Sequence, residues 1–553
     1  MDNRRRTLPA SDAPALTRPE QGPAWPLGLA GLALCVFAVV ALTSPGRIDV
    51  VDGHTRYEVG RSYVEHGDSI VRNPDAWFAV FPGRNGELYS NYRFPQSIVA
   101  AAAILASDLT GPVREIRRHF FFSLSGAVLC AAIAVLYACW FRRMGHGRIA
   151  SLAWAAGGIF CTPTWFYGTT TFDDVLGSLV VLLAIFAAGI LRQGRPIGAA
   201  VVSGSLLGLA FNCKPPLALF LPVAVAALWD ARRSKHERWL QARIVFFCAA
   251  VGVIGYEAYD LWKFPPSTWK ALADAREEYV AMWPGSPLAG FLSLLVSPGM
   301  GALGYWPAIV IALFGLVAWR RQQRLIAGMT GLSCLFFLAF IGSIRFFSGE
   351  PAWGPRYLTP VFALLWLVVP AGATRLRWPI AASLLALSFI IQLAGLSIDT
   401  LRFFSGENEL AVEGFLNDPW TYFRPGRSQL LARSRQIWEV MSYDGPAPKS
   451  FSPAKKPSLP LTFDLTAKEP LEATRHHTLS TFRPWWCAYP YLAADERPVD
   501  LRFALKLLLA TAVSGLMLLA CVAYSGIREN SGAGSRLPHV GFVLRDRSGT
   551  PNL

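Results

Sequence analysis

Two aspartates that follow the first apolar run of the sequence could do acid–base chemistry. Asp49 and Asp52 both lie in the segment 47–54, a few residues after that run ends. A general base is a carboxylate held within hydrogen-bond reach of the hydroxyl that it deprotonates, in a site partly shielded from water. Asp52 is the predicted base and Asp49 a supporting acid. The alternative is local structure, because Asp52-Gly53 is a common turn pair and an Asp before a helix is an ordinary N-cap.

A second acidic pair, Asp173-Asp174, follows the run 169–172 at the start of another apolar stretch. The N-terminus of a helix favours anions, and ionisable groups are less costly at the end of a membrane helix than at its middle. Capping therefore explains one of these aspartates. Two adjacent carboxylates indicate that one of them has a role in the site.

Three basic residues stand beside Pro or Gly segments between apolar runs, namely Lys214, Arg345 and Arg356. An anionic headgroup at the depth of the bilayer needs a fixed cation and helix N-terminal amides. The three residues are therefore predicted to hold the phosphate of a lipid-linked substrate. Snorkelling of a long side chain from a helix end would explain each of them without a function.

The sequence lacks the motifs typical of nucleotide-binding, metal-dependent and disulfide-rich proteins. The sequence contains no P-loop, no GxGxxG after a strand and no HExxH, and its eight histidines are scattered apart from His476-His477. None of the nine cysteines forms a CxxC pair, so neither a metal site nor a disulfide framework is predicted. An ATP-driven pump and a cytosolic nucleotide-sugar enzyme are disfavoured, and no cofactor is expected.

The elements that must position these residues are membrane helices. The 553 residues are 53% hydrophobic and 16% charged, against roughly 25% charged residues in a soluble domain. Windows of about 20 apolar residues predict an all-α polytopic membrane protein with about 12 spans, the total lying between 11 and 13. The predicted spans are 26–43, 118–140, 149–168, 174–191, 197–212, 216–229, 244–262, 302–319, 325–344, 357–373, 378–397 and 504–525.

The connections between these spans alternate between Arg-rich and Arg-poor. Arg and Lys collect in cytoplasmic loops, so the alternation predicts both termini in the cytoplasm of an inner-membrane protein. It also accounts for the net charge of +15 without nucleic acid as a partner. The outer face then carries the first loop, 44–117, with juxtamembrane helices, and a late segment, 401–503.

The resulting domain organisation is a tail, a catalytic region, the late segment, a last span and a second tail. The predicted boundaries are 1–25, 26–400, 401–503, 504–525 and 526–553. Trp485, Trp486 and Tyr489 in the late segment are predicted to form an interfacial aromatic belt, with stacking on a substrate as the alternative.

Four segments, in order, resemble the membrane glycosyltransferases of the GT-C type, close to protein O-mannosyltransferases and aminoarabinose transferases. They are Asp52-Gly53 with Tyr57 and Gly67-Asp68, the run 83–92, the run 297–301, and the run 353–360. The resemblance covers roughly residues 26–400.

The resemblance implies a polyprenyl-phosphate sugar donor, a base in the first outer loop that maps onto Asp52, inversion at the anomeric carbon, and no metal. One departure is that relatives often have Asp-Glu where this chain has Asp52-Gly53. The acceptor stays open among glycan, lipid and protein.

Two other functions fit parts of the sequence. A transporter or flippase of lipid-linked sugars would also need many spans, but transporters usually place ionisable residues near the midplane and show repeated halves. A surface-polysaccharide ligase or polymerase would use a basic late loop, and Arg424, Arg427, Arg433 and Arg435 supply one. A structural membrane protein without catalysis is the third alternative.

Overall fold

A computed structural model describes most of the chain. The described residues are 24–73, 79–230, 233–280, 287–349, 352–398, 419–441, 483–488 and 497–532. Most of the late segment, Tyr489 included, and most of both predicted tails lie outside these ranges.

Within the described ranges, eight helices are long and apolar enough to cross a membrane. They are α1 (Ala24–Thr43), α4 with α5 (Glu115–Ser123 and Ser125–Arg143), α8 (Asp174–Leu191), α9 (Pro196–Cys213), α11 (Lys235–Lys263), α16 (Arg324–Ser343), α19 (Trp378–Ser397) and α25 (Leu501–Gly532). The chain is thus an integral membrane protein of the predicted all-α polytopic class. Each of these helices overlaps a predicted span.

The other four predicted spans are shorter or broken helices, so the count of twelve is not confirmed. They correspond to α6 (Arg148–Phe160) with α7 (Thr164–Gly168), η2 (Pro215–Phe220) with α10 (Leu221–Leu228), α14 (Ala302–Tyr305) with α15 (Ile309–Gln322), and η3 (Arg356–Leu358) with α17 (Thr359–Trp366) and α18 (Val369–Ala373). Proline explains several of these breaks, because it removes a backbone donor and clashes with the preceding turn of a helix.

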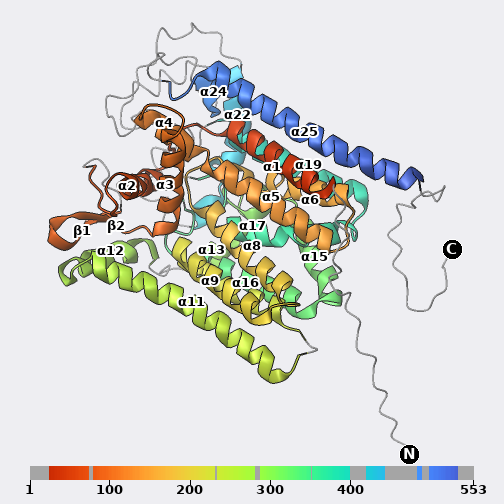
Figure 1. Ribbon diagram of the computed structural model, residues 1–553, viewed down its shortest axis with the longest axis horizontal. Helices are drawn as coiled ribbons and strands as arrows, with labels where there is room; N and C mark the ends of the chain where they lie inside the picture. Colours follow the sequence, from red (N-terminus) through yellow and green to blue (C-terminus); the bar gives the residue numbers. More distant parts are fainter. Residues whose placement is uncertain are drawn as a thin grey trace, which may run out of the picture.

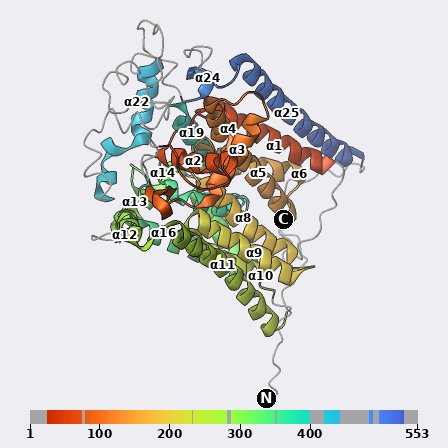
Figure 2. The same cartoon turned by 60° about the vertical axis from the view of Figure 1, so that its left-hand side comes forward.

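The remaining elements gather at one end of the helices, which we call the site end (Figures 1 and 2). They are α2 (Val51–Glu65), β1 (Val80–Pro82), η1 (Arg84–Gly86), β2 (Leu88–Ser90), α3 (Phe94–Asp108), α12 (Pro266–Val280), α13 (Pro287–Val296), η5 (Pro419–Phe423), η6 (Pro425–Arg427), α22 (Gln429–Met441) and α24 (Trp485–Ala488). The helices α2 and α3 confirm the prediction of helices in the first loop.

The one sheet in the described part of the chain is the hairpin of β1 and β2, which pair antiparallel from Val80 opposite Ser90 to Pro82 opposite Leu88. Its turn contains Asn85 and Gly86, both with positive φ. Asn and Gly are the residues that tolerate this conformation best.

The first and last membrane helices are antiparallel neighbours. A Cβ on Gly31 of α1 would lie 2.8 Å from the carbonyl oxygen of Gly515 in α25, and the Cys35 thiol donates to the oxygen of Ala512. Paired glycines let two helix backbones approach closely, as they do in membrane helix pairs generally. The start of α1 and the end of α25 therefore lie at the same end, opposite the site end (Figure 1).

Candidate active site

Irregular backbone at the site end brings ionisable side chains from four parts of the sequence together. α9 ends at Cys213 and Lys214 is extended, with φ −148° and ψ 127°. Asp173 occupies the N-cap position of α8 and Arg356 begins η3, while Asp52 lies in the first turn of α2. Irregular backbone in a membrane protein is tolerated where it is buried in protein.

Asp174 is the buried centre of this cluster. Its side chain is fully buried and forms ion pairs with the Lys214 ammonium and, at 3.0 Å, with Nε of Arg356. A buried carboxylate is stable only when its lone pairs are satisfied, so Asp174 and its two cations depend on one another.

Asp173 forms ion pairs with Arg56 and with Lys214, which it shares with Asp174. Nη2 of Arg56 lies 2.9 Å from its Oδ2, and the Lys214 nitrogen lies 3.3 Å from its Oδ1. Burial alone would raise the pKa of Asp173, but the Arg56 guanidinium, with Lys214 and Arg356, holds that pKa below its ordinary value. The side chain makes no capping hydrogen bond, so capping does not explain this aspartate.

Asp52 is the most accessible of the three carboxylates. Its side chain is 19% exposed, against 5% for Asp173 and 0% for Asp174. Its Oδ2 lies 3.4 Å from Nη2 of Arg356 and 3.8 Å from Nη1 of Arg56, and its carboxylate also accepts from the Tyr92 hydroxyl. The N-cap of α2 is Val50, so Asp52 is neither that cap nor a turn residue.

The cluster formed by these residues is balanced in charge, with Asp52, Asp173 and Asp174 facing Arg56, Lys214 and Arg356. Aromatic rings support the two guanidinium groups. Arg356 lies 3.3 Å from the ring centre of Phe172, and Arg56 lies 4.2 Å from that of Tyr92. Burial and the Asp52 charge raise the pKa of Tyr92 well above its ordinary value, so its hydroxyl stays a donor to Asp52.

Gly53 explains how α2 approaches the segment 169–173. A Cβ at this position would lie 2.2 Å from Oγ1 of Thr171 and 2.9 Å from Cγ2 of Ile48. The close approach of these segments leaves no room for a side chain. The departure from the Asp-Glu pattern of the resembling family is therefore a packing requirement of this chain.

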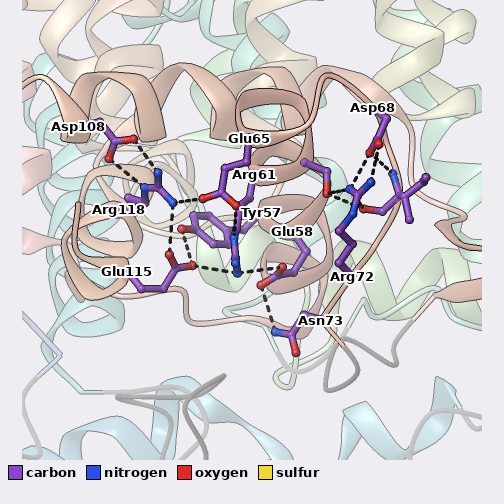
Figure 3. A network of polar contacts seen from close by, with 12 residues as sticks. Tyr57, Glu58, Arg61, Glu65, Asp68, Arg72, Asn73, Asp108, Glu115 and Arg118 are labelled. Atoms are coloured by element: carbon purple, nitrogen blue, oxygen red, sulfur yellow. Dashed lines mark hydrogen bonds and ion pairs between the residues drawn. The ribbon is translucent and has the colours of Figure 1, made fainter.

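A polar network outside the cluster fixes α2 against α3 and α4 (Figure 3). Arg118 of α4 binds both oxygens of Asp108 at 2.9 and 2.7 Å and also pairs with Glu65 of α2 at 2.5 Å. The Tyr57 hydroxyl donates to Glu115 at 2.7 Å. Bidentate pairs of this kind are directional, so the network sets the orientation of the helix that carries Asp52.

His54 is a neighbour of Asp52 that the structure does not favour as a base. Burial and the neighbouring His119 lower the pKa of His54 to about 3, although its ring donates to the backbone of Ile48. A base with so low a pKa removes protons poorly at neutral pH.

Asp49 lies beside the cluster and has a different set of partners. Its Oδ1 accepts from the backbone nitrogen of Thr171 at 3.2 Å, and its Oδ2 pairs at 2.9 Å with Nη2 of Arg483. Trp485, two residues further on, is fully buried and donates to Ala41. The predicted interfacial position of Trp485 is therefore wrong, whereas Trp486 is 40% exposed.

Of the predicted basic residues, Lys214 and Arg356 belong to the cluster. Arg345 follows α16 with an exposed side chain, and none of the ion pairs just described involves it. Arg93 was not predicted from the sequence. Its Nη1 donates to the carbonyl of Phe211 at 2.5 Å and its guanidinium lies 3.6 Å from the ring centre of Tyr256.

Arg56, Tyr92 and Arg483 were also missed by the sequence reasoning. Arg56 and Tyr92 stand in the first loop, where the predicted site residues are acids, and Arg483 is 434 positions from its partner Asp49. Among the described residues, no three His, Cys, Asp or Glu side chains are grouped so that they could hold a metal ion.

No family model and no curated protein matches the sequence. Solved structures similar to the chain include two crystal structures of ArnT from Cupriavidus metallidurans, one bound to undecaprenyl phosphate and one in the apo state. The first is 14% identical over 90% of this chain and 78% of the ArnT chain, with a TM-score of 0.47. The second is 14% identical over 76% of this chain and 81% of the ArnT chain, with a TM-score of 0.44.

In both cases the similar protein is an aminoarabinose transferase of the GT-C type.

Proposed function

We propose that this protein is a membrane glycosyltransferase that moves a sugar from a polyprenyl-phosphate donor to an acceptor hydroxyl, with Asp52 as the base. The observation that carries the proposal is the difference among the three clustered carboxylates. Asp173 and Asp174 are buried and close to their cations, whereas Asp52 is partly exposed and held at longer distances. A carboxylate that is fixed but accessible suits proton abstraction.

The proposed reaction is a single displacement with inversion. The acceptor O–H bond breaks and its proton passes to the Asp52 carboxylate. The acceptor oxygen forms a bond to the anomeric carbon while the bond from that carbon to the phosphate oxygen breaks, and polyprenyl phosphate leaves. Arg56 and Arg356 orient Asp52, and general-base assistance of this kind contributes about 10²- to 10⁴-fold in rate.

Stabilising the leaving phosphate needs an accessible cation of the cluster together with positive charge from outside it. Lys214, with a side chain 17% exposed, is the most accessible of its three cations. Arg93 lies close to the cluster, because Cys213 is within electrostatic range of Arg93 as well as of Lys214, Arg56 and Asp173. The contacts of Arg93 given above are to the Phe211 carbonyl and the Tyr256 ring. We therefore assign the phosphate to Lys214 and Arg93, with Arg356 beside them, and keep Arg345 as a predicted contributor.

The proposed setting is the cytoplasmic membrane of the cell, with both termini inside and the site end outside. Membrane lipids are partners of the apolar helices, and the donor reaches the site from the bilayer. The acceptor remains one of the three predicted classes, glycan, lipid or protein, and the transferred sugar is unassigned.

The test is release of polyprenyl phosphate by purified protein given a panel of undecaprenyl-phosphate sugars and acceptor-containing membranes. Asp52→Asn should reduce release by at least about 100-fold while its thermal unfolding stays close to that of the wild type. The matched control is Asp68→Asn, because Asp68 lies in the same loop, is one-third exposed and pairs with Arg72. This control should retain activity.

Full release by Asp52→Asn would contradict the proposed base. Donor binding without release by the wild type would favour a transporter of lipid-linked sugars instead.

A further inference from the structure

The end of α11 that lies near β1 and β2 buries three polar side chains (Figure 1). Tyr256, Asp260 and Lys263 are 3%, 7% and 2% exposed. Their spacing of four and three residues places them on one face of the helix. A buried charge is costly unless it is paired and hydrogen-bonded. The contacts that satisfy these side chains lead in two directions, and both directions end in the segment 90–93 of the first loop.

The first direction runs through Lys263 to Ser90. Nζ of Lys263 lies 2.9 Å from Oδ1 of Asp260 and donates to the carbonyl of Ser90 at 3.0 Å. Oγ of Ser90 accepts from the backbone nitrogen of Tyr92 at 2.9 Å. Tyr92 is the residue whose hydroxyl donates to Asp52. The ion pair of Asp260 with Lys263 thus fixes the backbone that places a hydrogen-bond donor on the proposed base.

The second direction runs through Tyr256 to Arg93. The Tyr256 hydroxyl is hydrogen-bonded to the Asp260 carboxylate. The Arg93 guanidinium lies 3.6 Å from the ring centre of Tyr256 and 4.5 Å from that of Phe211. Together with the bond to the Phe211 carbonyl, these rings restrict the planar guanidinium to one orientation. Arg93 is only half-buried, so it is held in place and still open to a ligand.

We propose that Asp260 is a positioning residue of the transferase, which holds Arg93 and Tyr92 in the places where the reaction needs them. The inference rests on the proposed function and deepens it. Asp260 acts through Lys263 on the backbone before Tyr92, and through Tyr256 on the cation assigned to the phosphate. A cation that is held in place before the donor binds needs no reorganisation during the reaction, so it stabilises the developing charge of a leaving group effectively.

The alternative is a purely structural role, in which the group only satisfies charges at the end of α11. Apolar residues of similar volume often stabilise a protein as well as a buried ion pair does, so stability alone is a weak reason for Asp260 and Lys263. Two separate connections from one carboxylate to the segment that carries Tyr92 and Arg93 are better explained by positioning.

The test is Tyr256→Phe in the full-length protein, because it removes the hydroxyl that links Asp260 to Arg93 and keeps the ring that Arg93 contacts. With an undecaprenyl-phosphate sugar that the wild type turns over, the KM for the donor should rise about tenfold while kcat stays nearly unchanged. Asp260→Asn loosens both connections, so it should raise the donor KM and also lower kcat.

The same change in an Arg93→Gln background separates positioning from stability. If Tyr256 acts through Arg93, Arg93→Gln alone raises the donor KM, and adding Tyr256→Phe raises it no further. An equal further rise would show that the hydroxyl acts independently of Arg93 and would overturn the inference. The matched control is Tyr259→Phe, because Tyr259 lies on the same helix and its hydroxyl bonds to Tyr63 instead. This control should keep the donor KM of the wild type.

The inference and the proposed function can fail separately. An active wild type together with an unchanged donor KM in Tyr256→Phe would refute the positioning role alone. If the wild type releases polyprenyl phosphate from no donor, the proposed function is wrong and the positioning role is refuted with it. If Tyr256→Phe does not fold, Asp260→Asn supplies the same comparison of donor KM in the wild-type and Arg93→Gln backgrounds.

Discussion

Single residues set the geometry of the candidate site, and Gly53 is the clearest example. Gly53→Ala would put a methyl group 2.2 Å from Oγ1 of Thr171, so α2 or the segment 169–173 must move. Overpacking of this kind typically costs about 1–3 kcal/mol. We expect a lower Tm and slower donor turnover, because Asp52 would shift relative to Arg356. Gly194→Ala, where no atom lies within 4 Å of the added carbon, is the control. Equal Tm and turnover in Gly53→Ala and wild type would refute this account.

The sequence predicted five of the six residues of the cluster, and each was recognisable because it is an ionisable residue close to the end of an apolar run. Asp52, Asp173, Asp174, Lys214 and Arg356 share that signal. Arg56 carries no such signal, because it lies within a polar stretch and meets Asp173 117 positions away. A local pattern cannot reveal a pair that only the tertiary fold creates.

At the scale of elements, the ion pair of Asp49 with Arg483 connects the first loop to the late segment. Arg483 also donates from its backbone to Ser397 at the end of α19, and its side chain is 2% exposed. Removing one partner of a buried ion pair costs about 3–5 kcal/mol, because the other charge is left uncompensated.

We therefore expect Asp49→Asn and Arg483→Met each to lower thermal stability, and the double variant to be more stable than the sum of the two losses implies. Thermal unfolding of the wild type, the two single variants and the double variant measures the coupling between Asp49 and Arg483. The surface pair of Asp68 with Arg72, treated in the same way, should show a coupling below about 1 kcal/mol. Strict additivity for Asp49 and Arg483 would mean that the pair does not hold the two segments together.

The apolar spans were predictable as elements because about 20 apolar residues are needed to cross a bilayer. Their interruptions were less predictable. The extended residue Lys214 and the 3-10 helix at Arg356 depend on neighbours such as Asp174, which bonds to both cations. Hydropathy contains no information about such tertiary bonds, so the broken helices were predicted as spans.

At the scale of the whole molecule, the charge distribution predicts the orientation in the membrane. α5, α8 and α19 each have one end at the site end and the other beside Arg-rich connections. Those connections carry Arg142, Arg143 and Arg148, then Arg192 and Arg195, then Arg375 and Arg377. Positively charged loops are retained in the cytoplasm, so the site end should face outward.

Cysteine labelling in intact cells tests this orientation. Glu87→Cys places an exposed thiol on the hairpin at the site end, and Gln193→Cys places one at the other end of α8. A membrane-impermeant maleimide should label Glu87→Cys in cells with a permeable outer layer and label Gln193→Cys only after the inner membrane is opened. The wild type, with nine native cysteines, gives the background. The reverse pattern would place the carboxylate cluster on the cytoplasmic side, where a donor displayed on the outer leaflet could not reach Asp52.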